Sequence, residues 1–130
     1  MKVLSIKEPF ATLIMNEYKM IETRSWKTNY RGELYIHASL TKMDKFNDRE
    51  ELKNLIKDLE MHNGYIICKC QLVDCVYMDE QFIKKIKKNN QEYICGHYEV
   101  GRYAWILNHI EPLDNPIKAK GRLGIWNYND

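Results

Sequence analysis

Residues 65–77 read Tyr-Ile-Ile-Cys-Lys-Cys-Gln-Leu-Val-Asp-Cys-Val-Tyr, and no other stretch of the chain says as much about its fold. The run is rich in β-branched and aromatic residues and contains neither proline nor glycine, which is typical of a strand. Its length is consistent with one long strand that bends midway. We therefore expect residues 65–77 to form the central strand of a sheet.

Shorter strands are expected on both sides of this segment. Leu34 and Ile36 alternate with more polar neighbours in residues 34–38, which is the pattern of a half-buried strand. The other expected strands are residues 3–6, residues 20–25, the alternating segment from Tyr103 to Asn108, and residues 117–120, with Pro112 and Pro116 in turns before the last of them.

Three segments have the apolar spacing of a helix. The first covers residues 9–17, where Pro9 suits the first helical position and Glu8 lies beside the positive end of the helix dipole. The second covers residues 48–62 and has an acidic outer face, and the third covers residues 79–88. Residues 89–101 are expected to be a loop. Strands with three inserted helices predict an α+β domain built on a small, strongly curved sheet or a partly open barrel.

Length and composition favour one ordered domain over residues 1–130. Hydrophobic residues make up 45% of the chain and charged residues 29%, and the formal net charge is only +2. No apolar run approaches the roughly 20 residues that a helix needs to span a bilayer, and the first residues do not resemble a secretory signal. We expect a soluble cytoplasmic protein without a membrane partner, and composition leaves the oligomeric state open.

Basic residues gather in two places. One run consists of Lys84, Lys85, Lys87 and Lys88, and the other consists of Lys118, Lys120 and Arg122. Either cluster could line a groove for a polyanion. The alternative for the first cluster is that its lysines keep the outer face of an amphipathic helix in water.

The four cysteines suggest a reduced core more than a metal site. Alternation places Cys68 and Cys70 on one face of the central strand. A sharper alternative is a zinc site made by Cys68 and Cys70 together with Cys95 and His97, although these spacings are not those of the usual zinc knuckles. Glycine-rich phosphate loops, nucleophile elbows and helical zinc motifs are missing from the sequence, so we expect neither a metal nor a cofactor.

The segment from residue 17 to residue 26 gathers Lys19, Glu22, Arg24 and Trp26. If residues 20–26 are extended, Glu22, Arg24 and Trp26 share one face, with Lys19 at its mouth. A planar cation, an anion and an indole can read the edge of a nucleobase and stack on its ring, or hold a phosphate. The alternative is an Arg–Glu pair on a solvated edge strand.

Several blocks of the sequence together resemble the ASCH domain family. They are residues 5–14, the pattern Lys19-x-x-Glu22-x-Arg24, residues 30–39, residues 101–105 and residues 120–126. The family motif is written Gly-x-Lys-x-x-Glu-x-Arg, and this chain has Glu17 at the glycine position. The resemblance covers the chain from residue 1 to about residue 127.

The resemblance implies a small mixed β-barrel of the PUA-like type with flanking helices, related to the EVE and YTH modules. It also implies a ligand cleft lined by Lys19, Glu22 and Arg24, with RNA, another single-stranded nucleic acid or a modified nucleoside as partner. Trp26 and Trp105 are the expected stacking surfaces, and the residues 101–105 add Arg102 to the expected ligand-binding set. A regulatory role in RNA metabolism follows as an expectation.

An enzyme is the alternative within the same resemblance. Some small ASCH proteins hydrolyse an acyl amide on a modified cytidine with a lysine, a threonine and a distant glutamate. The corresponding catalytic residues here would be Lys19 and Glu22, with Glu92 or Glu99 as the distant carboxylate, and a ribonuclease would need Lys19, Glu22 and His37 to converge. A protein-interaction domain with a vestigial cleft is a third interpretation.

Overall fold

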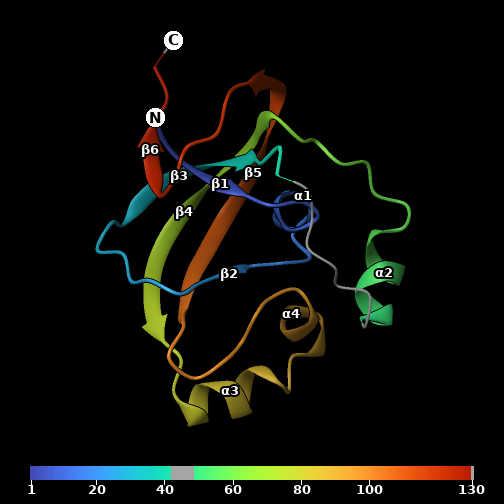
Figure 1. Cartoon of the computed structure of the whole chain (residues 1–130), viewed down its shortest axis with the longest axis vertical. Helices are drawn as coiled ribbons and strands as arrows, with labels where there is room; N and C mark the ends of the chain where they lie inside the picture. The colour runs from blue at the N-terminus through green and yellow to red at the C-terminus, as the bar shows by residue number, and fades with distance from the viewer. Residues whose placement is uncertain (42–48, 130) are drawn as a thin grey trace.

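The computed structural model of the chain describes residues 1–41 and 49–129 (Figure 1). The strands are β1 (Lys2–Ile6), β2 (Ile21–Arg24), β3 (Gly32–Ala38), β4 (Tyr65–Tyr77), β5 (Tyr103–Lys118) and β6 (Ile125–Asn127). The helices are α1 (Phe10–Met15), α2 (Glu50–Ile56), α3 (Glu80–Ile86) and α4 (Asn90–Ile94). The strands form one six-stranded sheet in the order β2-β5-β4-β3-β1-β6.

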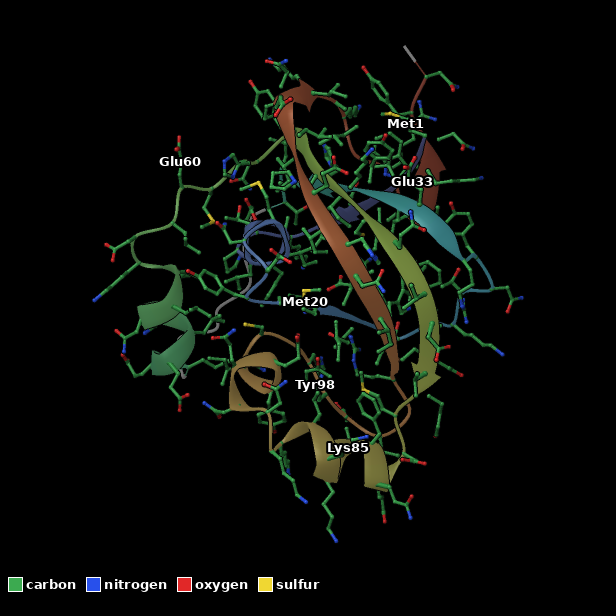
Figure 2. All side chains as sticks on the ribbon, turned by 180° about the vertical axis from the view of Figure 1, so that it is seen from behind. Met1, Met20, Glu33, Glu60, Lys85 and Tyr98 are labelled. Atoms are coloured by element: carbon green, nitrogen blue, oxygen red, sulfur yellow. The ribbon has the colours of Figure 1, made fainter. Side chains whose placement is uncertain are left out.

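The long strand β4 is central, as the sequence predicts. It pairs antiparallel with β3 on one side and with β5 on the other, and β4 and β5 run side by side through the molecule (Figures 1 and 2). Because β1 joins β3 in parallel, the sheet is mixed, and it curls into a half-barrel. The expected α+β fold with a small PUA-like barrel and flanking helices is confirmed.

The inside of the half-barrel is filled by side chains from β3, β4 and β5. Leu34, Ile36, Cys68, Cys70 and Trp105 belong to one apolar cluster, and none of them is more than 2% exposed. Burial raises the pKa of the Cys68 thiol well above its ordinary value and that of Cys70 to about 12, so both stay protonated at neutral pH. These two cysteines are therefore core residues, as their spacing predicts.

The prediction that Pro112 and Pro116 mark turns is wrong, because β5 continues through both of them. In the pairing of the two long strands, Cys68 lies opposite Pro112 and Ile66 lies opposite Ile117. Between these two pairs the chain advances by two positions along β4 and by five positions along β5. The extra residues of β5 form a bulged part of the strand, and the prolines fall there. Proline cannot donate a hydrogen bond to a neighbouring strand, and a bulge removes that need.

Helices α1 and α2 are shorter than the periodicity over residues 9–17 and 48–62 predicts, and the expected first residue of the second, Asp48, lies outside the described residues. Helix α3 falls within the expected residues 79–88. The carboxylate of Asp79 accepts a hydrogen bond from the backbone N–H of Phe82 and so begins that helix.

A fourth helix, α4, occupies part of the segment that was expected to be a loop. The side chain of Asn89 accepts a hydrogen bond from the backbone N–H of Glu92 at 3.4 Å and caps the helix. An asparagine three residues before a glutamate is a signal for a helix start. The sequence thus contains a helix-start signal at Asn89, and the expectation of a loop over residues 89–101 is wrong for residues 90–94.

The first basic cluster of the sequence lies on the second half of helix α3 and on the two residues that follow it. Lys84, Lys85, Lys87 and Lys88 are all exposed, and α3 lies at the end of the molecule that is far from both termini (Figure 1).

In residues 1–41 and 49–129, no helix combines the length and the apolar character that crossing a membrane requires.

Candidate ligand-binding cleft

A cleft of about 980 Å³ opens beside the half-barrel. Its walls come from the end of β1 and the start of α1, from β2 and the two residues after it, and from the loop that follows α4. Residues 39–41 and the loop 120–124 before β6 complete the wall. Segments that are far apart in the sequence therefore meet around one hollow.

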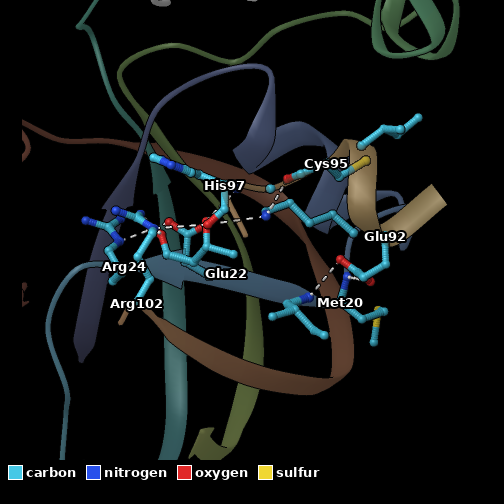
Figure 3. A network of polar contacts seen from close by, with 12 residues as sticks. Met20, Glu22, Arg24, Glu92, Cys95, His97 and Arg102 are labelled. Carbon is cyan, nitrogen blue, oxygen red and sulfur yellow. Dashed lines mark hydrogen bonds and ion pairs between the residues drawn. The ribbon is translucent and has the colours of Figure 1, made fainter. Parts of the chain in front are cut away.

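Lys19 lies at the bottom of this cleft and not at its mouth, where alternation along an extended segment had placed it. Its residue exposure is 1%, and its Nζ donates a hydrogen bond of 2.6 Å to the carbonyl oxygen of Cys95 (Figure 3). The same Nζ is 3.5 Å from Oε1 of Glu22 and 5.5 Å from the ring centroid of Phe10. The lysine ties the start of β2 to the loop after α4.

Glu22 and Arg24 form an ion pair on the cleft side of β2. Arg24 Nε donates to Glu22 Oε2 at 3.0 Å, and Arg24 Nη2 donates to the carbonyl oxygen of Ser5 at 2.8 Å (Figure 3). β2 is an edge strand of the sheet, but Glu22 is only 6% exposed. The pair is thus not the solvated one of the alternative interpretation. Lys19, Glu22 and Arg24 make one connected row of charges.

Trp26 lines the cleft, as the ring of Phe10 also does. It is 37% exposed, and its ring stands at 86° to that of Trp105 with the centroids 4.7 Å apart. Trp105 is completely buried, donates its Nε1–H to the carbonyl oxygen of Trp26 and does not line the cleft. The expectation that Trp105 offers a stacking surface is therefore corrected, because Trp105 belongs to the buried core of the half-barrel.

The loop after α4 is held in place by two arginines that also line the cleft. Arg102 Nε donates to the carbonyl oxygen of His97 at 3.0 Å, which fixes one side of the loop. Arg49 Nη1 donates to the carbonyl oxygens of Ile94 and Gly96 at 2.9 and 3.0 Å. Arg102 was expected here. Arg49 was missed, because it is a single arginine in an acidic stretch and no spacing links it to the motif.

His37 does not converge with Lys19 and Glu22, so the ribonuclease arrangement is wrong. Trp126 Nε1 donates to Ser5 Oγ at 3.0 Å, which leaves the Ser5 hydroxyl to donate to His37 Nδ1, also at 3.0 Å. His37 Nε2 then donates to the carbonyl oxygen of Ala119 at 2.7 Å. The histidine is a fully buried anchor for the start of the loop 120–124.

Gly121 sits against that anchor so closely that a side chain does not fit. A Cβ at this position would lie 2.8 Å from Ser5 Oγ and 2.9 Å from His37 Cε1. Because both atoms belong to the hydrogen-bonded chain, neither can move aside freely. We expect Gly121→Ala to lower the free energy of unfolding by about 1–2 kcal/mol in a urea titration. A stability within about 0.5 kcal/mol of wild type would show that the loop is not packed as described.

Glu92, the first of the two carboxylates considered as a distant catalytic group, supports the backbone instead. It is 6% exposed and accepts the backbone N–H groups of Met20 and Ile21 at 2.8 and 3.2 Å (Figure 3). It does not line the cleft, and neither does Glu99, which is exposed and bonded to His97. Burial raises the pKa of Glu92, against the opposing effects of Met20 N–H, Lys19 and Ile21 N–H.

This raised pKa predicts a pH dependence. The unfolded state ionises first as the pH rises above the ordinary carboxyl pKa, so Glu92 makes the free energy of unfolding fall over that window. Wild type should therefore gain stability relative to Glu92→Gln as the pH is lowered from neutrality toward the ordinary glutamate pKa. Urea unfolding of both proteins at several pH values measures this difference, with the exposed Glu60→Gln as a flat control. A difference that grows in the opposite direction would contradict the assigned environment.

The zinc alternative has no support in the described part of the chain. Within residues 1–41 and 49–129, no three His, Cys, Asp or Glu side chains are placed to hold a metal ion together. Cys95 lines the cleft, and burial raises its pKa to about 11. Its carbonyl oxygen, not its thiol, has the structural role by accepting from Lys19.

The cleft has a marked excess of positive charge. Among the described residues that line it, seven are lysine or arginine, namely Lys7, Lys19, Arg24, Arg49, Arg102, Lys120 and Arg122. Two are glutamate, Glu8 and Glu22. Glu8 is committed to the protein, since it accepts from the backbone N–H and the hydroxyl of Thr12 at the start of α1. Glu22 is thus the acidic group at the bottom of a basic cleft, and an anionic ligand with donor groups of its own would match it.

The chain is similar to a known domain family and to two known proteins. A model of the ASCH domain family matches residues 4–117. The chain is 31% identical over 131 residues to human (Homo sapiens) activating signal cointegrator 1, and 32% identical over 132 residues to the same protein of the mouse (Mus musculus). Each match covers 95% of this chain and 21% of the relative. The chain thus spans about a fifth of the length of the curated relatives it matches.

Proposed function

We propose, from the premise that this chain belongs to the ASCH domain family, that it binds RNA or another single-stranded nucleic acid through the cleft beside β2. The observation that carries the proposal is the row Lys19–Glu22–Arg24, which is buried at one end and leads to the half-exposed ring of Trp26. Basic residues surround this row, and phosphate is the anion that every strand of nucleic acid supplies.

Each group in the row has a part in this proposal. Lys19 and Arg24 hold the carboxylate of Glu22 in one orientation, so it can accept hydrogen bonds from the amino or imino groups of a base. Arg24 Nη1 has no hydrogen-bond partner in residues 1–41 and 49–129, so it is available to a phosphate or a carbonyl. Trp26 offers its ring for stacking, and base–aromatic stacking contributes about 1–3 kcal/mol per base.

The hydrolase alternative gains no support from the geometry. Lys19 Nζ is engaged by the Cys95 carbonyl and by Glu22, and its burial keeps it from a substrate. His37, Glu92 and Glu99 do not line the cleft. Ser5 lines the cleft and its hydroxyl lies 3.0 Å from His37 Nδ1, but the histidine is fully buried and its Nε2 donates to the carbonyl oxygen of Ala119, so the pair has a structural role in this fold.

A binding titration tests the proposal. A fluorescein-labelled RNA of about ten nucleotides and mixed sequence is added to the protein, and its anisotropy is followed at about 50 and 200 mM salt. We expect saturable binding that weakens as the salt concentration rises, together with a change in tryptophan fluorescence. Trp26→Ala should lower the affinity about tenfold, in line with the loss of one stacked base. Absence of binding at both salt concentrations would overturn the proposal.

A further inference from the structure

The loop 120–124 presents an apolar side chain to water at the rim of the cleft. Leu123 is 98% exposed, more than any other large hydrophobic residue described, and it still lines the cleft. Its neighbour Arg122 is exposed as well. A leucine in that position gains nothing from the fold of this chain, since burial is what makes an apolar side chain stabilising. Because Leu123 lines the cleft, its position indicates that it contacts a ligand bound there.

The conformation of this loop is set from both sides. Gly121 packs against Ser5 and His37, where no Cβ fits. Gly124 has a φ of 66°, in the left-handed region that favours glycine, and it turns the chain into β6. Between these two glycines, Arg122 and Leu123 project from a fixed base. The loop therefore presents a cation and an apolar group side by side in a defined place.

The cations of this loop differ from the other arginines of the cleft. Arg24, Arg49 and Arg102 all donate hydrogen bonds to backbone carbonyl oxygens. In the described ranges 1–41 and 49–129, Lys120 and Arg122 form neither a side-chain hydrogen bond nor an ion pair with the protein. The cleft thus has positioned cations at its bottom and uncommitted ones at its rim.

We propose that residues 120–123 are a second contact for a nucleic-acid strand. This proposal rests on the function proposed above, and it extends the contact from one nucleotide to its neighbours. Lys120 and Arg122 bind the phosphates on either side of the nucleotide held by Glu22 and Arg24, and Leu123 packs against the adjacent base. The ligand of the cleft is then an oligonucleotide and not a free nucleoside. Apolar side chains pack against the faces of bases in protein–nucleic acid complexes. Lysine and arginine bind the phosphates there.

The size of the cleft agrees with a strand. A volume of about 980 Å³ lies at the upper end of the range of roughly 300–1,000 Å³ that holds a whole drug-sized molecule. One nucleoside would leave much of this space empty. Leu40 and Trp26 also line the cleft and are exposed like Leu123, so a strand would meet accessible side chains from three segments of the chain.

The test compares two ligands on matched variants. The labelled RNA of about ten nucleotides is titrated by anisotropy, and the four free ribonucleosides are titrated by tryptophan fluorescence. The loop variants are Lys120→Gln with Arg122→Gln, and separately Leu123→Ala. Their matched controls on surfaces outside the cleft are Lys84→Gln with Lys85→Gln on α3, and Val73→Ala on β4.

We expect the double loop variant to bind the RNA about tenfold more weakly, with a salt dependence reduced by about two units of slope. Leu123→Ala should weaken RNA binding about threefold to fivefold and leave the salt slope unchanged, because no phosphate contact is lost. Nucleoside affinity should change less than twofold in both variants, and the control variants should behave as wild type.

Three results would overturn the proposal, and they can be told apart. If the loop variants bind the RNA as wild type does while Arg24→Ala loses it, the cleft function stands and the loop contact is wrong. If wild type binds neither the RNA nor any nucleoside, the proposed function fails and the loop contact fails with it. Wild type that binds nucleosides as tightly as the RNA would also contradict a strand contact.

Discussion

Lys19→Met is expected to lower the free energy of unfolding by about 3 kcal/mol. The substitution removes the donor of the 2.6 Å hydrogen bond to the Cys95 carbonyl oxygen and the cation 3.5 Å from Glu22. Breaking a buried ion pair on one side typically costs 3–5 kcal/mol, because the remaining charge stays buried without its partner. The expected value lies at the low end, since Arg24 still pairs with Glu22. Urea unfolding followed by tryptophan fluorescence measures the loss.

Two further variants separate the ion pair from a general effect of removing a lysine. Lys53 is 3.6 Å from Glu50 on the exposed face of α2, also three residues apart, so Lys53→Met is a matched surface control. It should cost less than about 0.5 kcal/mol. Lys19→Met combined with Glu22→Gln should recover about 1 kcal/mol relative to Lys19→Met alone, because the buried carboxylate that has lost one of its two cationic partners is no longer charged. Equal stability of Lys19→Met and Lys53→Met would contradict the buried role of Lys19.

Arg24→Ala is expected to weaken binding of the ten-nucleotide RNA about thirtyfold, or about 2 kcal/mol. Hydrogen bonds that involve a charged group contribute about 1.5–3 kcal/mol, and the substitution removes one from the ligand and releases Glu22 from its fixed orientation. Arg24→Lys should restore only part of the affinity, because a lysine keeps the charge without the planar fork. Anisotropy titrations of the three proteins measure the series.

Arg31 provides the matched control for this series. It is an arginine that contacts Asp74 at 3.6 Å and donates to the carbonyl oxygens of Thr28 and Tyr30, and it does not line the cleft. Arg31→Ala should change the affinity by less than about twofold. If Arg31→Ala and Arg24→Ala lower the affinity equally, the effect comes from the loss of overall charge and not from the cleft.

The sequence predicts those parts of the site that depend on local periodicity. Glu22 and Arg24 are two residues apart on a strand, so alternation alone places them on one face, and the structure pairs them there. The central strand over residues 65–77 follows in the same way from composition and the absence of proline and glycine. Both features can be predicted because each depends only on residues that are close together in the sequence.

Features that depend on distant contacts could not be predicted in this way. The burial of Lys19 requires the carbonyl oxygen of Cys95, which is 76 residues further along the chain. Trp105 is completely buried because it packs in the core of the half-barrel against side chains of other strands and against the ring of Trp26, and these contacts join distant parts of the chain. Arg49, just before α2, donates hydrogen bonds to the carbonyl oxygens of Ile94 and Gly96. The residues around Arg49 in the sequence contain no pattern that predicts this contact.

The central claim is that a nucleic-acid strand binds in the cleft at Trp26, and a nitrogen–proton NMR titration with the ten-nucleotide RNA tests it most directly. The chain has three tryptophans, so its spectrum contains three indole N–H signals. We predict that the Trp26 indole signal shifts and saturates with the affinity seen by anisotropy, while the backbone amides of Lys84 and Lys85 on α3 stay in place. An unmoved Trp26 signal with shifts confined to α3 would contradict the account.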